Sequence, residues 1–424
     1  MPRILWYMLA AIDLLAAIAP TCAAAGATEP DGPSEAGGRG ATVVRVAEFN
    51  VQDVRTPDLL NREHPRLKQI AGVLQRIRPN VVLISEIAYD APGAPGVEAD
   101  QEPGQNGQRL ADNFLAVPQE PDLKPLRYRA FMAPVNTGMP SGFDLNNDGT
   151  VTARFPAPNP NGPMGTPGAQ SAAGRAYAGD CWGFGTFPGQ YGMALLVDER
   201  LEILEDQVRT FRLLPWDYMP GAFLPPGPDG EGSWYDDDER ALVRLSSKSH
   251  WDVPVRLPNG AVVHFLCSHP TPPAFDGPEK RNARRNHDEI RFWADYIEGS
   301  TYIVDDAGHP GSLEPGALFV ILGDLNADPD EGSSFKDPIG TLLFSNPRIN
   351  TSATPVADRA WPGLEADDTS TFGLRVDYVL PSKAIPVIRA SVWRTGWRSI
   401  GRRRAVPSDH FPVWAELRIP APGD

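Results

Sequence analysis

A cluster of acidic and amide side chains follows a short apolar run near residue 320. The segment ALFVILGDLNADPDEG covers residues 317–332, and Asp324 and Asn326 come directly after the apolar residues 318–322. Such a run fits a strand that is buried on both faces, and Gly323 would end it where another backbone passes closely. Loops at strand ends commonly carry catalytic residues. Asp and Asn also form turns, so this segment alone does not decide between a site and a turn.

Polar side chains recur at the ends of other predicted strands, which the alternation of apolar and polar residues places at 42–50, 81–87, 261–269, 374–380 and 411–419. Each polar residue has an ordinary explanation, such as a cap or a buried histidine with satisfied hydrogen bonds. One shared site explains all of them together. The set consists of Asn50, Glu86, His269, Asp324, Asn326, Asp377, Asp409 and His410.

The motifs that contain these residues resemble the endonuclease/exonuclease/phosphatase superfamily, which includes deoxyribonuclease I, apurinic endonucleases, inositol-phosphate 5-phosphatases and neutral sphingomyelinases. They occur in the family's order and span residues 43–419: EFN (48–50), LISEI (83–87), CSH (267–269), ILGDLNADP (321–329), RVDYVL (375–380) and SDHFPV (408–413). The resemblance implies an α/β (α+β) fold, a four-layer α/β sandwich in which two packed, mainly antiparallel β-sheets are flanked by helices.

The resemblance also implies a metal site. Glu86 is the expected principal ligand of Mg²⁺ or Mn²⁺, with Asn50 and Asp409 beside it. Because Mg²⁺ keeps several water ligands and takes few carboxylates, a sparse set of oxygen donors suits it.

Five further residues receive catalytic roles from the resemblance. Asp324 would orient or deprotonate the attacking water, and Asn326 would hold a non-bridging phosphate oxygen. His410 would face the scissile phosphate, while Asp377 fixes its tautomer and raises its pKa. His269 would contact the phosphate or assist the leaving group. Water would then attack phosphorus in line with the leaving group, and the metal and the hydrogen-bond donors would stabilise the developing charge.

These motifs predict an exported, divalent-metal-dependent phosphoesterase that hydrolyses a phosphodiester or a phosphomonoester. Nucleic acid, a small phosphoester and a lipid head group all stay open as substrates, and we expect a monomer. The net charge of −15 argues against a processive, high-affinity DNA-binding protein. The alternative is a non-catalytic extracellular protein on the same fold that binds its partner with the help of calcium.

Export is predicted from the first residues of the chain. Arg3 precedes an apolar run at 4–19 and the small residues TCAAAG, which is the pattern of a signal peptide at 1–25. Anchoring as a lipoprotein through Cys22 is less favoured, because APTC is a poor lipobox. We therefore expect a secreted or periplasmic protein with a flexible linker at 26–41. A single domain would follow at 42–421, with no transmembrane segment and with long loop insertions at about 88–190 and 213–240.

Helical and strand periodicity completes the expected scaffold. Residues 64–80 and 285–299 carry apolar side chains at helical spacing, and the former begins with Pro65 and ends at Pro79. The segments 191–199 and 201–212 are interpreted as a hairpin.

A second metal motif stands apart from the catalytic set. Asp144, Asn146, Asp148 and Gly149 match the first half of a calcium-binding loop, but the twelfth position is Phe155 instead of glutamate. A structural Ca²⁺ ion that fastens the long insertion is favoured slightly over a turn without an ion.

Two smaller hypotheses concern charge and redox state. Arg402 and Arg403 lie close in sequence to His410 and are candidate phosphate contacts, with ordinary surface charge as the equal alternative. Cys181 and Cys267 are the two cysteines that remain after signal removal, and they are a candidate disulfide in an oxidising compartment. Two buried free thiols are the alternative.

Overall fold

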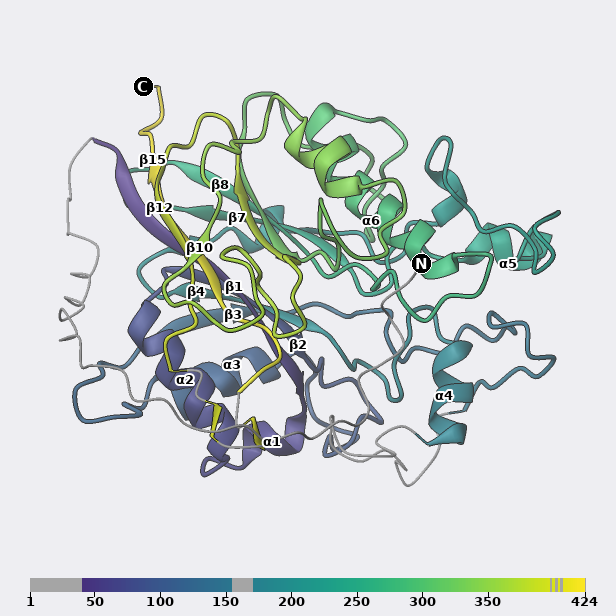
Figure 1. Cartoon of the computed structure of the whole chain (residues 1–424), viewed down its shortest axis with the longest axis horizontal. Coiled ribbons are helices and arrows are strands. Elements are labelled where there is room, and N and C mark those ends of the chain that lie inside the picture. The colour runs from purple at the N-terminus through teal and green to yellow at the C-terminus, as the bar shows by residue number, and fades with distance from the viewer. Residues whose placement is uncertain (1–39, 155–170, 397–398, 401–402, 405–406, 424) are drawn as a thin grey trace. The chain divides into compact units, whose positions relative to one another are not determined.

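The computed structural model describes residues 40–154, 171–396, 399–400, 403–404 and 407–423. The expected signal peptide and nearly all of the linker lie outside these residues. Among the described residues, the chain forms two mixed β-sheets and a β13–β14 pair (Figure 1). The first sheet has the order β10-β12-β15-β1-β2-β4-β3, and the second has the order β11-β9-β8-β7-β5, with β6 also paired to β7.

The strands of the first sheet are β10 (Val356–Ala357), β12 (Val387–Val392), β15 (Val413–Ile419), β1 (Thr42–Val54), β2 (Val81–Ile87), β4 (Met193–Asp198) and β3 (Tyr128–Phe131). Those of the second sheet are β11 (Asp377–Pro381), β9 (Leu318–Asp324), β8 (Val262–Ser268), β7 (His250–Arg256), β5 (Glu202–Ile203) and β6 (Arg209–Thr210). The short strands β13 (Ser399–Ile400) and β14 (Arg403–Arg404) pair with each other.

The helices of the described chain are α1 (Thr56–Leu60), α2 (Pro65–Ile77), α3 (Asn106–Leu110), α4 (Ala172–Gly179), α5 (Asp237–Leu242) and α6 (Arg281–Glu298). Short 3₁₀ or π turns are η1 (Ala111–Leu115), η2 (Glu205–Gln207), η3 (Trp216–Tyr218) and η4 (Ile339–Phe344). No helix in the described part of the chain is both long enough and apolar enough to cross a bilayer.

The two sheets pack face to face, and a helix covers each outer side (Figure 1). Strand β9 shows how the sequence builds these layers, because successive side chains of a strand point to opposite faces. Val320 and Leu322 join the core between the sheets, whereas Phe319 and Ile321 join the core beneath α6. The apolar face of α2 packs on the other side of the first sheet. The prediction of two packed, mainly antiparallel sheets flanked by helices is confirmed.

The beginning and the end of the domain are paired strands. Thr42 of β1 is opposite Ile419 of β15, and the pairing is antiparallel through Glu48 and Val413. On its other side β1 runs parallel to β2, with Asn50 next to Ser85. Because β1 lies between β15 and β2, the segments EFN, LISEI and SDHFPV, which are far apart in the sequence, meet at one edge of the sheet.

The hairpin expected at 191–212 is wrong. Strand β4 joins the first sheet, whereas β5 and β6 pair with β7 of the second sheet. The chain crosses between the sheets here, because β4 is already paired on both edges, with β2 and with β3. Strand β7 itself was not predicted.

The described parts of the segment between 88 and 190, which are 88–154 and 171–190, contain more regular structure than the expected loops. It contains the edge strand β3 and the helices α3 and α4. The α3 helix begins at Asn106, whose side chain donates to the Thr56 hydroxyl and the Ala88 carbonyl. These bonds fix the start of the insertion to the scaffold that carries the site.

Candidate active site

A strained segment at the end of β1 and β2 positions the first two site residues. The register of the parallel β1–β2 pair shifts between Asn50 and Val54, and Gln52 and Asp53 adopt φ values of 53° and 51°. Glu86, on β2, has a φ of 63°. Positive φ is unfavourable for side chains with a Cβ atom and is concentrated at functional sites. This bulge turns Asn50 and Glu86 toward each other.

Asn50 connects the carboxylates of both sheets. Its Nδ2 donates to Glu86 Oε1 at 3.1 Å and to Asp324 Oδ2 at 2.9 Å. The second oxygen of Glu86 accepts from the Asp53 backbone N–H at 3.0 Å. Asn50 is fully buried, so these bonds leave its amide in one orientation. A single amide therefore holds two acidic groups that lie 238 positions apart in the chain, at residues 86 and 324.

Strand pairing in the second sheet places Asp324 beside Asp377. The two residues are cross-strand partners in the antiparallel β9–β11 pair. Strand β9 continues through Gly323 to Asp324, one residue beyond the expected end. The expected close approach at Gly323 is present, since a Cβ atom there would stand 2.0 Å from the Ser268 carbonyl oxygen.

Two histidines contact Asp324: His410 precedes β15, and His269 follows β8. His410 Nδ1 is 2.9 Å from Asp377 Oδ2, and its Nε2 is 3.8 Å from Asp324 Oδ2. His269 Nε2 is 3.4 Å from the same Asp324 oxygen. His269, Asp324, Asp377 and His410 are each at most 5% exposed. The Asp377–His410 contact is the pair that the resemblance implies, whereas the contacts of the two histidines with Asp324 were not predicted.

The two histidines differ in charge. Burial alone would lower the pKa of His410, but the carboxylates of Asp377 and Asp324 outweigh burial and raise this pKa well above its ordinary value. Burial lowers the pKa of His269 well below its ordinary value, and Lys248 and His410 add to this effect. His410 is therefore a cation at neutral pH, whereas His269 is neutral. Environments that separate the pKa values of neighbouring groups are typical of acid–base sites.

The carboxyl groups of the site have pKa values close to neutrality. Burial raises the pKa of Asp324 to about 6, although His410 opposes the rise. Burial and the nearby Asp409 carboxylate raise the pKa of Glu86 to about 7. Each carboxylate is thus held in the fold at some electrostatic cost, and a bound cation would relieve it.

The donor set fits a divalent cation that prefers oxygen ligands. Glu86 and Asp409 bring carboxylate oxygens, whereas Asn50 turns its Nδ2 to Glu86 and its Oδ1 accepts from the Gln52 N–H at 2.9 Å. Asp324, Asp377 and His410 also bring one ligand atom each within 4.8 Å of the others. In that second group, however, Asp377 and the Nδ1 atom of His410 are already bonded to each other. Asn50, Glu86 and Asp409 therefore stay the predicted ligand set.

Asn326 and Asp409 are the remaining residues of the predicted set. Asn326 has a φ of 53°, its backbone N–H donates to Asp324 Oδ1 at 2.9 Å, and its Nδ2 donates to the Pro270 carbonyl at 3.1 Å. Asp409 is partly exposed and follows Ser408, whose hydroxyl donates to the Asn50 carbonyl. All eight residues of the predicted set therefore belong to one contact and electrostatic network.

Sequence reasoning missed Lys248, which is 5% exposed and precedes β7. Its Nζ donates to the Pro270 carbonyl at 3.2 Å, the same acceptor that Asn326 uses. Burial lowers the pKa of Lys248, and the neighbouring carboxylates of Glu289, Glu86 and Asp324 oppose this effect. A lone lysine between serines carries no pattern that distinguishes it from a surface residue.

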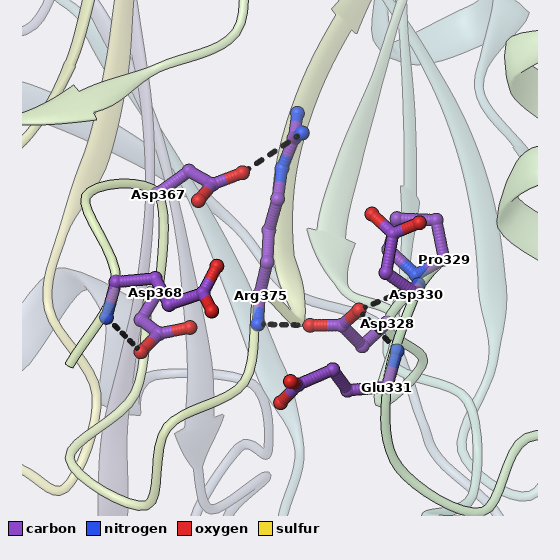
Figure 2. Close-up of a pocket in the computed structure, with 8 residues that line it drawn as sticks. Asp328, Pro329, Asp330, Glu331, Asp367, Asp368 and Arg375 are labelled. Atoms are coloured by element: carbon purple, nitrogen blue, oxygen red, sulfur yellow. Dashed lines mark hydrogen bonds and ion pairs between the residues drawn. The ribbon is translucent and has the colours of Figure 1, made fainter. Parts of the chain in front are cut away.

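An acidic pocket includes Asp328 and Arg375, which lie two residues from Asn326 and Asp377 in the chain (Figure 2). Asp328 follows Asn326 by two positions, and its carboxylate accepts from the backbone N–H groups of Asp330, Glu331 and Arg375. The bonds to Asp330 and Glu331 close a turn at this point of the chain. The residues that line the pocket are Asp328, Pro329, Asp330, Glu331, Glu365, Asp367, Asp368 and Arg375.

The predicted calcium loop forms a compact turn. The carboxylate of Asp144 accepts from the backbone N–H groups of Asp148 and Gly149, and Asn146 Oδ1 also accepts from Asp148 N–H. These bonds are compatible with a turn alone and with an ion-binding loop. Phe155 lies outside the described residues, and calcium binding stays a prediction.

The candidate disulfide is wrong, because Cys181 and Cys267 are both free, buried thiols. Cys181 Sγ is directed to the Tyr177 carbonyl, and Cys267 lies in the core between the sheets near the Phe265 carbonyl. The two thiols thus have separate local partners.

Of the candidate phosphate contacts, Arg402 lies outside the described residues and Arg403 belongs to β14. Phosphate binding by these arginines stays a prediction.

Comparisons with known proteins identify the family of this chain. The model of the Endonuclease/Exonuclease/phosphatase family matches residues 47–410. Among solved structures, an endonuclease/exonuclease/phosphatase from Beutenbergia cavernae is 18% identical, with 90% of this chain and 73% of that chain covered and a TM-score of 0.46. A family protein from Bacteroides thetaiotaomicron is 13% identical, with coverages of 89% and 96% and a TM-score of 0.47.

A mannosyl-6-phosphatase from Bacteroides thetaiotaomicron is 12% identical, with 88% of this chain and 99% of that chain covered and a TM-score of 0.45. A search of the curated proteins gave no match. The structural likenesses are too distant to argue for a substrate. The family match, in contrast, covers most of the chain and includes every predicted catalytic and metal-binding residue. The chain therefore belongs to the endonuclease/exonuclease/phosphatase family, whose members are metal-dependent phosphoesterases.

Proposed function

We propose that the protein is an exported, divalent-metal-dependent phosphoesterase that hydrolyses its substrate by in-line attack of water on phosphorus. The observation that carries the proposal is the position of Asp324, which lies 3.4 Å from a neutral histidine and 3.8 Å from a histidine that is a cation. A non-catalytic binding protein would have no need for this pair of opposite protonation states. The N-terminal sequence pattern supports export.

Asp324 is suited to the role of the general base. Its pKa of about 6 leaves it ionised at neutral pH and still able to take a proton from water. Asn50 holds one oxygen of Asp324, and the Asn326 backbone N–H holds the other. The carboxylate is therefore fixed before substrate arrives, which reduces the reorganisation needed in the transition state.

The two histidines would act on the phosphoryl group. His410 carries a positive charge and presents Nε2 to the site, because Nδ1 is bonded to Asp377. It would donate a hydrogen bond to a phosphoryl oxygen as negative charge grows there. His269 is neutral, and its Nε2–H group would hold either Asp324 or the substrate.

Glu86, Asn50 and Asp409 would hold the divalent cation. When bound, that ion supplies Lewis-acid stabilisation of phosphoryl charge and neutralises the acidic groups around it. Asn326 would direct its amide to a non-bridging oxygen, since its backbone N–H bonds to Asp324 and its side chain lies at the Pro270 carbonyl, next to His269 in the chain.

A hydrolysis panel tests the proposal. The secreted form is assayed with p-nitrophenyl phosphate, bis(p-nitrophenyl) phosphate, plasmid DNA, RNA, an inositol phosphate and sphingomyelin, in Mg²⁺, Mn²⁺, Ca²⁺ or EDTA. We expect EDTA-sensitive cleavage that falls at least about tenfold in Glu86→Ala and in His410→Ala. His309→Ala is the matched control, because His309 is a 77% exposed surface histidine. A folded, metal-loaded protein that cleaves none of these substrates would contradict the proposal.

The exported state has its own test. Full-length protein is expressed in a bacterial host, and the N-terminus of the product is read by mass spectrometry from the periplasm, the medium and the cell. We expect a product cleaved near residue 25, outside the cytoplasm.

A further inference from the structure

We propose that Lys248 is a further substrate-binding residue that contacts a terminal phosphate group, and that the substrate is a small phosphomonoester. This inference rests on the proposed phosphoesterase function and assigns its substrate class. It is carried by the burial of one lysine within the site and by the charge of the wall beside that site.

Lys248 is a buried ammonium group with few partners. Its side chain is almost completely removed from water, yet its one hydrogen bond among the described residues is to the Pro270 carbonyl at 3.2 Å. No ion pair within 4.0 Å involves Lys248 in the described part of the chain. A lysine ammonium has three donors, so two of them remain for other groups. Burial of an ammonium group without a paired anion is costly and needs a reason.

The nearest acid does not provide that reason. Glu289 lies close enough to influence Lys248 electrostatically, but its oxygens are occupied. Oε1 accepts from the backbone and the hydroxyl of Ser247, and Oε2 accepts from the Thr271 N–H. Glu289 thus fixes the segments on either side of Lys248 and compensates its charge at a distance.

The position of Lys248 within the site identifies its ligand. Its Nζ and the Nδ2 of Asn326 donate to the same carbonyl oxygen of Pro270, so the two nitrogens lie next to each other. Asn326 is the residue expected to hold a non-bridging phosphate oxygen. The charge of Lys248 contributes to the lowered pKa of His269, which directly precedes Pro270 in the chain. A phosphate oxygen bound by Asn326 would therefore meet the free donors of Lys248.

Charge distinguishes a terminal phosphate from an internal one. A phosphomonoester carries a charge of about −1.5 to −2 at neutral pH, whereas a phosphodiester carries about −1. The site already holds one cation, His410, and Lys248 would add a second one when a bound anion offsets the lowering of its pKa by burial. Two protein cations in addition to a metal ion suit a dianionic group better than a monoanionic group.

The wall beside the site disfavours a nucleic-acid polymer. The acidic pocket of Figure 2 is lined by six carboxylate residues and one arginine, and it begins two residues after Asn326. The chain as a whole also has a net charge of −15. Polymers of nucleic acid are bound mainly through cationic surfaces. A small molecule with one terminal phosphate avoids this repulsion.

The experiment compares wild type, Lys248→Met and Lys248→Arg, with Lys336→Met as the matched control. Lys336 lies over the Phe223 ring in a separate surface groove. Steady-state kinetics on p-nitrophenyl phosphate and bis(p-nitrophenyl) phosphate separate KM from kcat, and binding of inorganic phosphate to the Mn²⁺-loaded protein is measured by calorimetry. Thermal unfolding confirms that each variant is folded.

We expect the wild type to prefer the monoester by at least about tenfold in kcat/KM. Lys248→Met should weaken phosphate binding at least about tenfold and raise the KM for the monoester by a similar factor, because a charged hydrogen bond is lost. The diester should lose less than about threefold. Lys248→Arg should recover part of the phosphate affinity, and Lys336→Met should behave as wild type.

Other outcomes separate this inference from the proposed function. Unchanged phosphate affinity in a folded Lys248→Met protein overturns the role of Lys248, and a wild-type preference for the diester or plasmid DNA overturns the substrate class. A wild type that hydrolyses no phosphoester overturns the proposed function. In that case phosphate binding that is lost in Lys248→Met would still support the phosphate site itself.

Discussion

Glu86→Gln should make the metal-free protein more stable and the metal-loaded protein less stable. Glu86 is held beside Asp409 with a pKa of about 7, instead of the ordinary 4.5. Without a cation, the folded state therefore binds more protons than the unfolded state between these two values. Since stability falls with rising pH wherever the folded state binds more protons, the deficit develops between about pH 4.5 and about pH 7 and is complete above that range.

The magnitude follows from the size of the pKa shift. One pKa unit corresponds to about 1.4 kcal/mol, so the free energy of unfolding at pH 8 is reduced by at most about 3 kcal/mol. Glu86 keeps some exposure to solvent, which lowers this figure. Glutamine would also replace one of the two oxygens that accept from Asn50 and Asp53, at a cost of about 1 kcal/mol. A net gain of about 1 kcal/mol is therefore expected for metal-free Glu86→Gln.

Urea unfolding at pH 8, in EDTA and in excess Mn²⁺, measures both effects. A cation at 100 times its Kd stabilises the wild type by about 2.7 kcal/mol, and Glu86→Gln should lose most of this gain. Glu199→Gln is the control, because Glu199 is exposed in the turn after β4. If Glu86→Gln is less stable than wild type in EDTA, or gains as much from Mn²⁺, our account of the buried charge and its metal is refuted.

Three further predictions concern the acid–base pair and the close packing beneath it. Asp377→Asn removes the carboxylate that contributes most to the raised pKa of His410. The alkaline limb of the pH–kcat profile should therefore move to lower pH, and kcat should fall about 10²-fold or more. An alkaline limb at the wild-type pH would contradict the Asp377–His410 pairing. In the wild type, kcat/KM at saturating metal should fall at a pH below about 6, because protonated Asp324 cannot accept a proton and the bound cation lowers the pKa that Asp324 has without metal. Asp324→Asn should abolish this limb together with most of the activity. Gly323→Ala should lower the free energy of unfolding by about 1–3 kcal/mol in urea, because its Cβ would stand 2.0 Å from the Ser268 carbonyl oxygen; a neutral effect would mean that β8 and β9 separate easily.

Short-range patterns were sufficient for most of the scaffold. The helix predicted at 64–80 is α2, and the strands predicted around Asn50, Glu86 and Asp324 are β1, β2 and β9. The spacing of apolar residues and the local propensity of the sequence predict such elements, because each helix or strand buries the same face, or both faces, along its whole length. The family and the fold class were also predicted correctly, since the motifs at the strand ends follow the family's order.

Long-range pairing was beyond the sequence patterns. The segment 201–212 follows β4 closely, yet its strands pair with β7 of the other sheet, and the two cysteines lie in separate surroundings. Neighbours in the sequence form a hairpin only when no better partner is available, and that competition is decided by the whole sheet.

What the sequence by itself determined was the set of residue types at the strand ends and hence the kind of chemistry. Only the tertiary structure decided their protonation states and the presence of Lys248 among them. His269 and His410 are the same residue type, but burial makes one neutral and the carboxylates of Asp377 and Asp324 make the other a cation. A pKa and the cost of a buried charge depend on distances to groups from other strands, and those distances exist only once the chain has folded.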